Sequence, residues 1–146
     1  MKIRIKKLDP RAEIPVRKHS SDAGYDLVAV SKEVDELGCL VYGTGLAFEI
    51  PEGHVGLLFP RSSICEHGET LTNSVGVIDS NYRGEVKFKF RQYYDLNYVH
   101  SLKKEYQVGE RVGQIIVLPY PEVEYELSET LSDSDRGEKG FGSTGK

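Results

Sequence analysis

The C-terminal segment 136–146 (Arg-Gly-Glu-Lys-Gly-Phe-Gly-Ser-Thr-Gly-Lys) combines residue types that bind nucleotides. Its glycines let the backbone approach a ligand closely and turn N–H groups toward an anion. Arg136 can bind phosphate oxygens in bidentate fashion, and the Ser143 and Thr144 hydroxyls add neutral donors. Phe141 can stack on a base, which contributes about 1–3 kcal/mol. The segment predicts a flexible arm that folds over a nucleotide, and its alternative is a disordered solubilising tail.

Polar side chains also occur where apolar strands begin or end. Asp26 lies at the start of a strand within 23–27 (Ala-Gly-Tyr-Asp-Leu), where an aspartate is most often a turn residue. Arg61, Ser62 and Ser63 follow the apolar strand 55–59. A guanidinium and two hydroxyls suit phosphate, but a serine that caps a helix explains the same residues equally well.

The segment 73–84 (Asn-Ser-Val-Gly-Val-Ile-Asp-Ser-Asn-Tyr-Arg-Gly) offers a general base. Its apolar strand ends in Asp79, and Tyr82 lies in the turn that follows. An aspartate with a reference pKa of ~3.9 is ionised near neutrality and could activate a water molecule. The alternative is a turn aspartate beside a packed tyrosine.

Gln114 lies in the otherwise apolar strand of segment 109–117 (Gly-Glu-Arg-Val-Gly-Gln-Ile-Ile-Val). A buried amide without hydrogen-bond partners destabilises a fold. We therefore expect Gln114 either to satisfy a turn or to face a ligand.

Alternation of apolar and polar residues dominates the chain and predicts short strands. The clearest case is 85–91, where Val86, Phe88 and Phe90 share one face; the same period occurs at Ile3/Ile5, Val28/Val30, Val55/Leu57 and Ile115/Val117. With 15 glycines, 6 prolines and almost no helical periodicity, the chain is predicted to be all-β, a barrel or jelly roll. We expect helical turns only at 31–37, closed by Gly38, and at 62–67. Residues 93–106 have no clear period and predict a long connection.

Length and composition predict one globular domain. A chain of 146 residues can bury most of its apolar surface in a single core. We place the β domain at 1–127, and a linker followed by the glycine-rich arm at 128–146.

The composition also excludes several classes of protein. No apolar run approaches the roughly 20 residues of a membrane span, and the alternating N-terminus does not resemble a signal peptide. The 2 cysteines and 4 histidines lack the spacing of a disulfide framework or zinc site. A net charge of −4 argues against direct nucleic-acid binding. We expect a soluble cytoplasmic protein, with the nucleus as a further possibility.

Taken together, the segments AGYDL, PRSS, GVIDSNYRG, GERVGQI and RGEKGFGSTG resemble the trimeric deoxyuridine triphosphatase (dUTPase) family in order and spacing across 23–145. The resemblance implies a jelly-roll-like β barrel. It further implies a homotrimer with three shared active sites that hydrolyses dUTP to dUMP and pyrophosphate with Mg²⁺.

The resemblance also implies roles for the residues that match the family's motifs. Asp79 would activate the water that attacks the α-phosphorus and would bind the sugar 3′-hydroxyl, while Asp26 would orient waters on the Mg²⁺. Tyr82 would exclude a ribose 2′-hydroxyl. The remaining substrate contacts would come from Arg61, Ser62, Ser63 and Gln114 at the phosphates, Asn73, Gly76, Val77 and Ile78 at uracil, Arg136 at the γ-phosphate, Phe141 stacked on uracil, and Gly142, Ser143 and Thr144 in the arm.

Two departures and two rivals accompany the resemblance. PRSS stands where many members have PRSG, and the connection 91–108 is longer than in compact members. In dCTP deaminase, which shares the barrel, a catalytic glutamate corresponds to Lys89, and a lysine cannot replace a carboxylate. The other rival is a nucleotide-gated regulatory protein on the same scaffold, with 93–106 as the contact surface.

Overall fold

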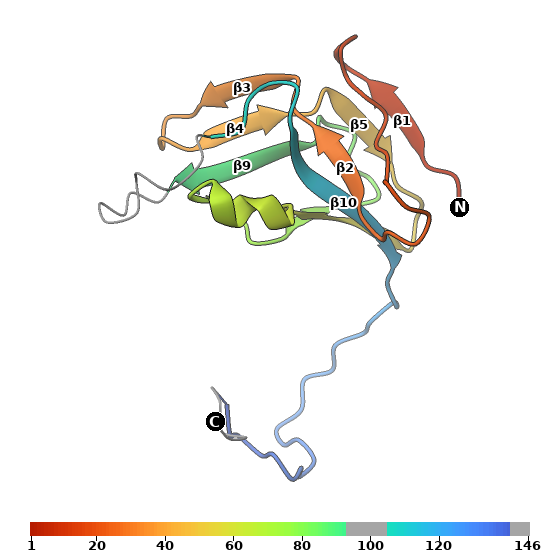
Figure 1. Cartoon of the computed structure of the whole chain (residues 1–146). Coiled ribbons are helices and arrows are strands. Elements are labelled where there is room, and N and C mark those ends of the chain that lie inside the picture. Colours follow the sequence, from red (N-terminus) through yellow and green to blue (C-terminus); the bar gives the residue numbers. More distant parts are fainter. Residues whose placement is uncertain (93–104, 141–146) are drawn as a thin grey trace.

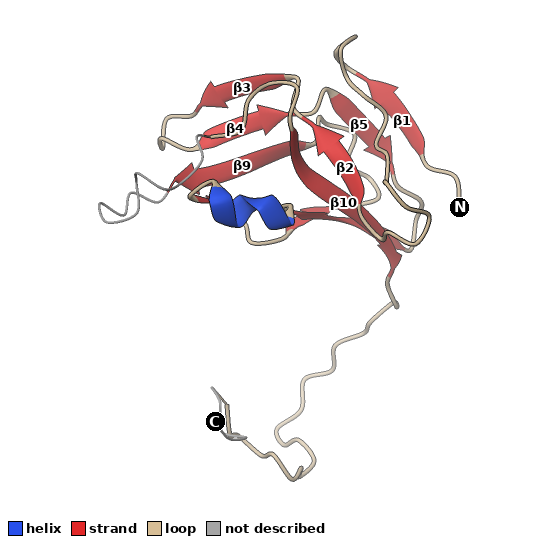
Figure 2. Cartoon of the chain, viewed as in Figure 1, coloured by secondary structure: helices blue, strands red, loops and turns tan. Residues whose placement is uncertain are grey.

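The chain folds into layers of antiparallel strands, as predicted (Figures 1 and 2). The structure is a computed structural model and describes residues 1–92 and 105–140. The antiparallel sheets confirm the predicted all-β, jelly-roll-like fold class. Its strands are β1 (Arg4–Lys7), β2 (Tyr25–Val28), β3 (Ser31–Val34), β4 (Leu40–Gly43), β5 (Leu46–Glu49), β6 (His54–Phe59), β7 (Glu69–Leu71), β8 (Gly76–Ile78), β9 (Lys87–Gln92) and β10 (Arg111–Pro119), and a 3₁₀ helix η1 (Ser62–Glu66) follows β6.

Two four-stranded sheets carry most of the structure. One has the order β2-β10-β6-β8 and the other β3-β4-β9-β7, while β1 and β5 form a separate pair. Strands distant in sequence therefore become neighbours: β10 lies between β2 and β6. The strands of the segments that contain Asp26, Gln114 and Arg61 are therefore adjacent in this first sheet.

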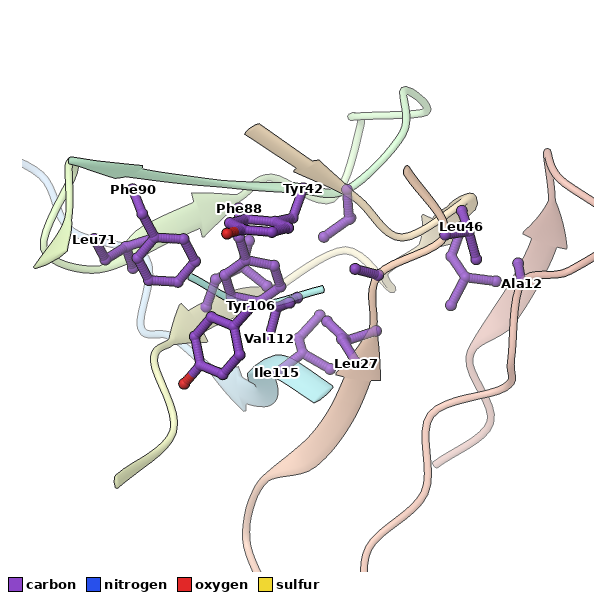
Figure 3. Packing of buried hydrophobic residues seen from close by; sticks show 14 of the residues in the cluster. Ala12, Leu27, Tyr42, Leu46, Leu71, Phe88, Phe90, Tyr106, Val112 and Ile115 are labelled. Atoms are coloured by element: carbon purple, nitrogen blue, oxygen red, sulfur yellow. The ribbon is translucent and has the colours of Figure 1, made fainter. Parts of the chain in front are cut away.

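The hydrophobic core is rich in aromatic residues and contains side chains from both four-stranded sheets (Figure 3). Val86, Phe88 and Phe90 are all buried, which confirms the face predicted from alternation in this segment. The Tyr42 ring meets Phe90 edge-on, with 5.8 Å between centroids. Large aromatic rings in edge-to-face contact contribute more than their buried area alone.

The helical turn expected at 31–37 is wrong. Residues Ser31–Val34 form β3, which pairs with β4, and a tight turn joins the two strands. The Asp35 carboxylate accepts hydrogen bonds from the backbone N–H groups of Leu37 and Cys39, each at 2.9 Å, and Gly38 has a φ of 74°. An aspartate that binds the backbone and a glycine in the left-handed region are typical of a hairpin turn. The helical turn expected at 62–67 is confirmed by η1.

The chain leaves the sheets at Pro119, the last residue of β10. Residues 120–140 form no helix or strand, are exposed, and run away from the sheets (Figure 1). The boundary at 127 stays a prediction. None of the helices in 1–92 and 105–140 is long and apolar enough to span a bilayer.

Candidate active site

Adjacent strands bring Asp26, Arg61 and Gln114 together. In β10, Gln114 lies opposite Asp26 of β2 on one side and opposite Phe59 of β6 on the other. Arg61 follows Phe59 by two residues, so it enters the same end of the sheet. The sheet order thus joins three segments that are far apart in sequence.

Asp26 is held between two arginines. Arg61 Nε donates to Asp26 Oδ1 at 3.0 Å, and Arg111 Nη1 donates to Asp26 Oδ2 at 3.1 Å. The Asp26 side chain is 19% exposed, whereas that of Arg111 is 51% exposed. Two guanidiniums outweigh one carboxylate, and each guanidinium has five N–H donors, so donors remain for an anionic ligand.

Sequence reasoning missed Arg111. It lies in the GERVGQI segment that had been singled out, but its charge had no assigned role. A cation at the first residue of an apolar strand was the signal that the sequence offered.

Gln114 satisfies a turn, which is one of its two predicted roles. Its Nε2 donates to the carbonyl of Pro60 at 3.2 Å. Gly24 faces the Gln114 side chain so closely that any Cβ at position 24 would collide with Oε1. The glycine of the AGYDL segment therefore makes room for the glutamine.

Ser62 and Ser63 differ in their surroundings within η1. Ser62 is exposed, whereas Ser63 is half-buried. The Ser63 Oγ lies 3.2 Å from the hydroxyl of Tyr106, a buried residue that sequence reasoning did not select. The residues before β10 gave no period that could have indicated Tyr106.

A second group of predicted residues surrounds a hollow of about 550 Å³ beyond β8. The Tyr82 hydroxyl donates to the carbonyl of Glu85 at 3.0 Å, and its ring lies over Gly84, where a side chain would collide with it. Asp79 is exposed, and its carbonyl accepts the N–H of Tyr82 at 3.1 Å. The hollow is lined by Val77, Ile78, Asp79, Tyr82, Glu85 and Lys87.

Asn73 and Gly76 precede the residues that line the hollow. Gly76 is the first residue of β8 and lies against Leu58, and the Asn73 side chain approaches it. Asn73 itself is exposed in the turn before β8. The segment predicted to read a base is therefore a turn that leads into β8, which pairs with β6 at the edge of the first sheet.

The two groups lie at opposite ends of β6. The register pairs Gly56 with Ile78, so Asp79 lies beside Val55, at the beginning of the strand. Arg61 follows the end of the strand, and at a rise of about 3.3 Å per residue the two positions are roughly 15–20 Å apart. Within 1–92 and 105–140, no hydrogen bond or ion pair joins the Asp26 group to the residues around the hollow.

The predicted arm is described only as far as residue 140. Arg136 is exposed, and its Nε donates to the carbonyl of Lys139 at 2.9 Å. Phe141, Gly142, Ser143 and Thr144 lie outside the described residues, as does most of the connection 93–106.

Comparison with known proteins decides the family. The family model described as dUTPase matches residues 10–145. The chain belongs to the dUTPase family. A dUTPase of Nautilia profundicola, named deoxyuridine 5'-triphosphate nucleotidohydrolase, is 41% identical, with 100% of both chains covered. The enzyme of the same name from Corynebacterium diphtheriae is 39% identical over 98% of this chain and 92% of its own.

Solved dUTPase structures share the fold. The Staphylococcus bacteriophage 80alpha dUTPase with dUPNHPP has a TM-score of 0.82 and 29% sequence identity, with 99% of each chain covered. A G164S mutant of that dUTPase with the same compound has a TM-score of 0.79 and 27% identity, again over 99% of each chain.

Lys89 has a structural partner in this dUTPase fold. Its Nζ forms an ion pair with Asp35 in the turn between β3 and β4. The hydrogen bond from Lys89 holds the pKa of Asp35 below its usual range. Lys89 therefore stabilises the hairpin between β3 and β4.

Proposed function

We propose that the chain is a dUTP diphosphatase that hydrolyses dUTP to dUMP and pyrophosphate. Family membership supports this, as does likeness to dUTPases solved with dUPNHPP. The observation that carries it most directly is the pair of arginines fixed on Asp26, because it concentrates N–H donors beside the exposed Ser62. Such an arrangement suits the oxygens of a triphosphate.

Asp79 is proposed as the general base. Its exposed position on the hollow gives its carboxylate access to water, which a general base must reach directly or through one water molecule. It takes the proton of the water that attacks the α-phosphorus. The same carboxylate binds the 3′-hydroxyl of the sugar.

The hollow is proposed to select the deoxyribose and the base. Tyr82 is held by the Glu85 carbonyl, so its ring presents a fixed wall where a 2′-hydroxyl would otherwise lie. A wall that leaves no room rejects the larger sugar. Uracil would be read by the turn and strand β8 that run through Asn73, Gly76, Val77 and Ile78.

The donor set at Asp26 fits Mg²⁺ held through waters and phosphates. Mg²⁺ prefers one or two carboxylates, several waters and substrate phosphates to a full protein cage. Both carboxylate oxygens of Asp26 already accept hydrogen bonds from arginines, and no cluster of metal-ligating residues occurs in the described part of the chain. The ion would therefore contact Asp26 through water molecules. When bound, the ion would neutralise charge on the phosphate oxygens.

A homotrimer with shared sites is proposed because the resemblance to trimeric dUTPases implies it, and the separation along β6 supports sharing between copies. Asp79 and Arg61 of one chain are too far apart to act on one phosphate chain, so each site takes Asp79 from one copy and Arg61 from another. The segment after β10 supports contact between copies, since Tyr125 is 92% exposed and Leu127 is fully exposed in the isolated chain. The arm with Arg136 and Phe141 would close over a site of a neighbouring copy.

Pyrophosphate release measured with dUTP, dCTP, dTTP and UTP tests the proposed activity. We expect turnover of dUTP in the presence of Mg²⁺ and strong discrimination against the other three. Ammonia release from dCTP would indicate the deaminase reaction, and comparable rates on dTTP would contradict the proposed uracil pocket.

A further inference from the structure

Tyr106 is packed into the core on one side. It is 3% exposed and lies five residues before β10. Its ring meets Tyr42 edge-on at 6.2 Å and lies 6.1 Å from the ring of Phe90. Figure 3 shows its hydroxyl directed away from the other rings, at the margin of the cluster. The core therefore fixes where this hydroxyl lies.

On its other side Tyr106 contacts η1, the helix that follows Arg61. The His67 ring stacks on the Tyr106 ring, with 3.9 Å between centroids. The Ser63 hydroxyl lies 3.2 Å from the Tyr106 hydroxyl. Tyr106 thus contacts one residue near the beginning of η1 and the residue that directly follows its end.

The backbone at Tyr106 is anchored as well. Lys32 Nζ from β3 donates to the Tyr106 carbonyl at 3.0 Å, and it also forms an ion pair with Glu105. A phenol keeps its proton at neutral pH and can donate, and burial raises the pKa of the Tyr106 phenol further. A rotating serine hydroxyl is restricted to one direction by such a partner.

We propose that Tyr106 is a positioning residue: through Ser63 its hydroxyl fixes the segment that carries Arg61 against the strand that carries Arg111 and Gln114. The inference rests on the proposed function of this site. Ser63 then acts through Tyr106, and its hydroxyl is not a direct phosphate donor. The serine in place of the glycine common in this motif thereby gains a role that depends on a tyrosine 43 residues away.

Steady-state kinetics with dUTP on Tyr106→Phe, Ser63→Ala and the double variant test the coupling. Each single change should lower kcat on the order of tenfold, because small displacements of positioning groups are costly, while KM changes less than about threefold. The double variant should be no slower than either single variant, since both remove one interaction.

Tyr42→Phe is the matched control. It removes a buried hydroxyl from the same aromatic cluster, but that hydroxyl contacts Glu69 at 3.4 Å and does not contact η1. Its kcat should equal that of the wild type. Wild-type kcat in both single variants, or losses that multiply in the double variant, would overturn the inference. An equal loss in Tyr42→Phe would also overturn it.

Hydrogen exchange without nucleotide separates this inference from the proposed activity. The backbone N–H groups of Ile64 and His67, bonded to the Arg61 and Ile64 carbonyls at 3.0 Å, should exchange faster in Tyr106→Phe and Ser63→Ala than in Tyr42→Phe. Unchanged exchange sinks the positioning role even if the wild type hydrolyses dUTP. An inactive wild type refutes the proposed function alone, and if Tyr106→Phe does not fold, Ser63→Ala decides.

Discussion

At the scale of single residues, the close contact between Gly24 and the Gln114 side chain leaves no room for a larger residue at position 24. Gln114 belongs to the group of residues proposed to bind the phosphates. Gly24→Ala would push the end of the flexible Gln114 side chain away from the Pro60 carbonyl. We expect kcat/KM for dUTP to fall on the order of tenfold. The melting temperature should change little, because a side chain moves and the backbone does not.

Gln114→Ala provides the comparison for that experiment. It should cause a similar loss of kcat/KM, and the double variant should lose no more than either change alone. A full-rate Gly24→Ala protein would show that Gln114 can leave the Pro60 carbonyl without consequence.

Asp79 provides the second residue-scale prediction. Asp79→Asn keeps the side-chain shape but removes the proposed base, so the rate of pyrophosphate release should fall by about 10²–10⁴. Calorimetric titration with dUPNHPP should give an affinity close to that of the wild type. A loss of less than about tenfold would place the base elsewhere.

At the scale of elements, Glu69 at the beginning of β7 is an unusual core residue. It is 5% exposed, and among the described residues nothing hydrogen-bonds its Oε2. Burial raises the pKa of this carboxyl from 4.5 to about 7, and Glu105 adds to the shift, whereas the hydrogen bond from Tyr42 opposes it. At a pH between these two values, Glu69 therefore holds a proton in the native state and has lost it in the unfolded chain.

The sign of this shift predicts the pH dependence of stability. Between about pH 4.5 and 7 the folded state holds more protons than the unfolded state, so the free energy of unfolding falls as pH rises. Across this pH range the free energy of unfolding falls by about 3 kcal/mol in total, because a shift of one pKa unit corresponds to about 1.36 kcal/mol. Glu69→Gln removes the titrating group, so its melting temperature relative to the wild type should rise from pH 5 to pH 8.

Glu33→Gln, on the exposed edge of β3, is the control for removing a carboxylate from the protein. If the difference between Glu69→Gln and the wild type is the same at both pH values, Glu69 does not titrate in the native state over this range.

The sequence predicted those elements whose pattern depends only on near neighbours. Alternation placed Val86, Phe88 and Phe90 in the core because each strand residue faces the side opposite to the next. It failed at β3, where Asp35 and Gly38 form a turn whose hydrogen bonds decide between helix and hairpin. Tyr106 and Glu69 gave no signal, because their burial depends on strands brought together from distant parts of the chain.

At the scale of the whole molecule, shared sites can be tested by mixing two inactive proteins. Asp79→Asn and Arg61→Ala disable opposite ends of β6, so each should be nearly inactive alone. Trimers refolded from equal amounts of both should recover about a quarter of the wild-type rate, since random assembly leaves that share of sites intact. A mixture no more active than its parts would mean that each site lies within one chain.

The arm provides the other prediction at this scale. Residues after β10 contribute little to the core, with Tyr125 92% and Leu131 90% exposed. A chain that ends at Glu129 should therefore fold and assemble like the full chain in circular dichroism and light scattering. It should lose most of its dUTP turnover, because Arg136 and Phe141 are missing; an unchanged rate would refute the role of the arm.

The proposed sharing of sites between copies has a consequence for inheritance. In a mixture of normal and damaged chains, the share of working sites would equal the share of normal chains, because each site uses one Asp79. Here a chain with a damaged Asp79 would enter trimers with normal chains and spoil sites to which its neighbours contribute intact arginines. Some of those neighbours' own Asp79 carboxylates would still work, paired with the arginines of the damaged chain. Damage would therefore be shared among partners, and a second allele could complement the first if its fault lies at the other end of the strand.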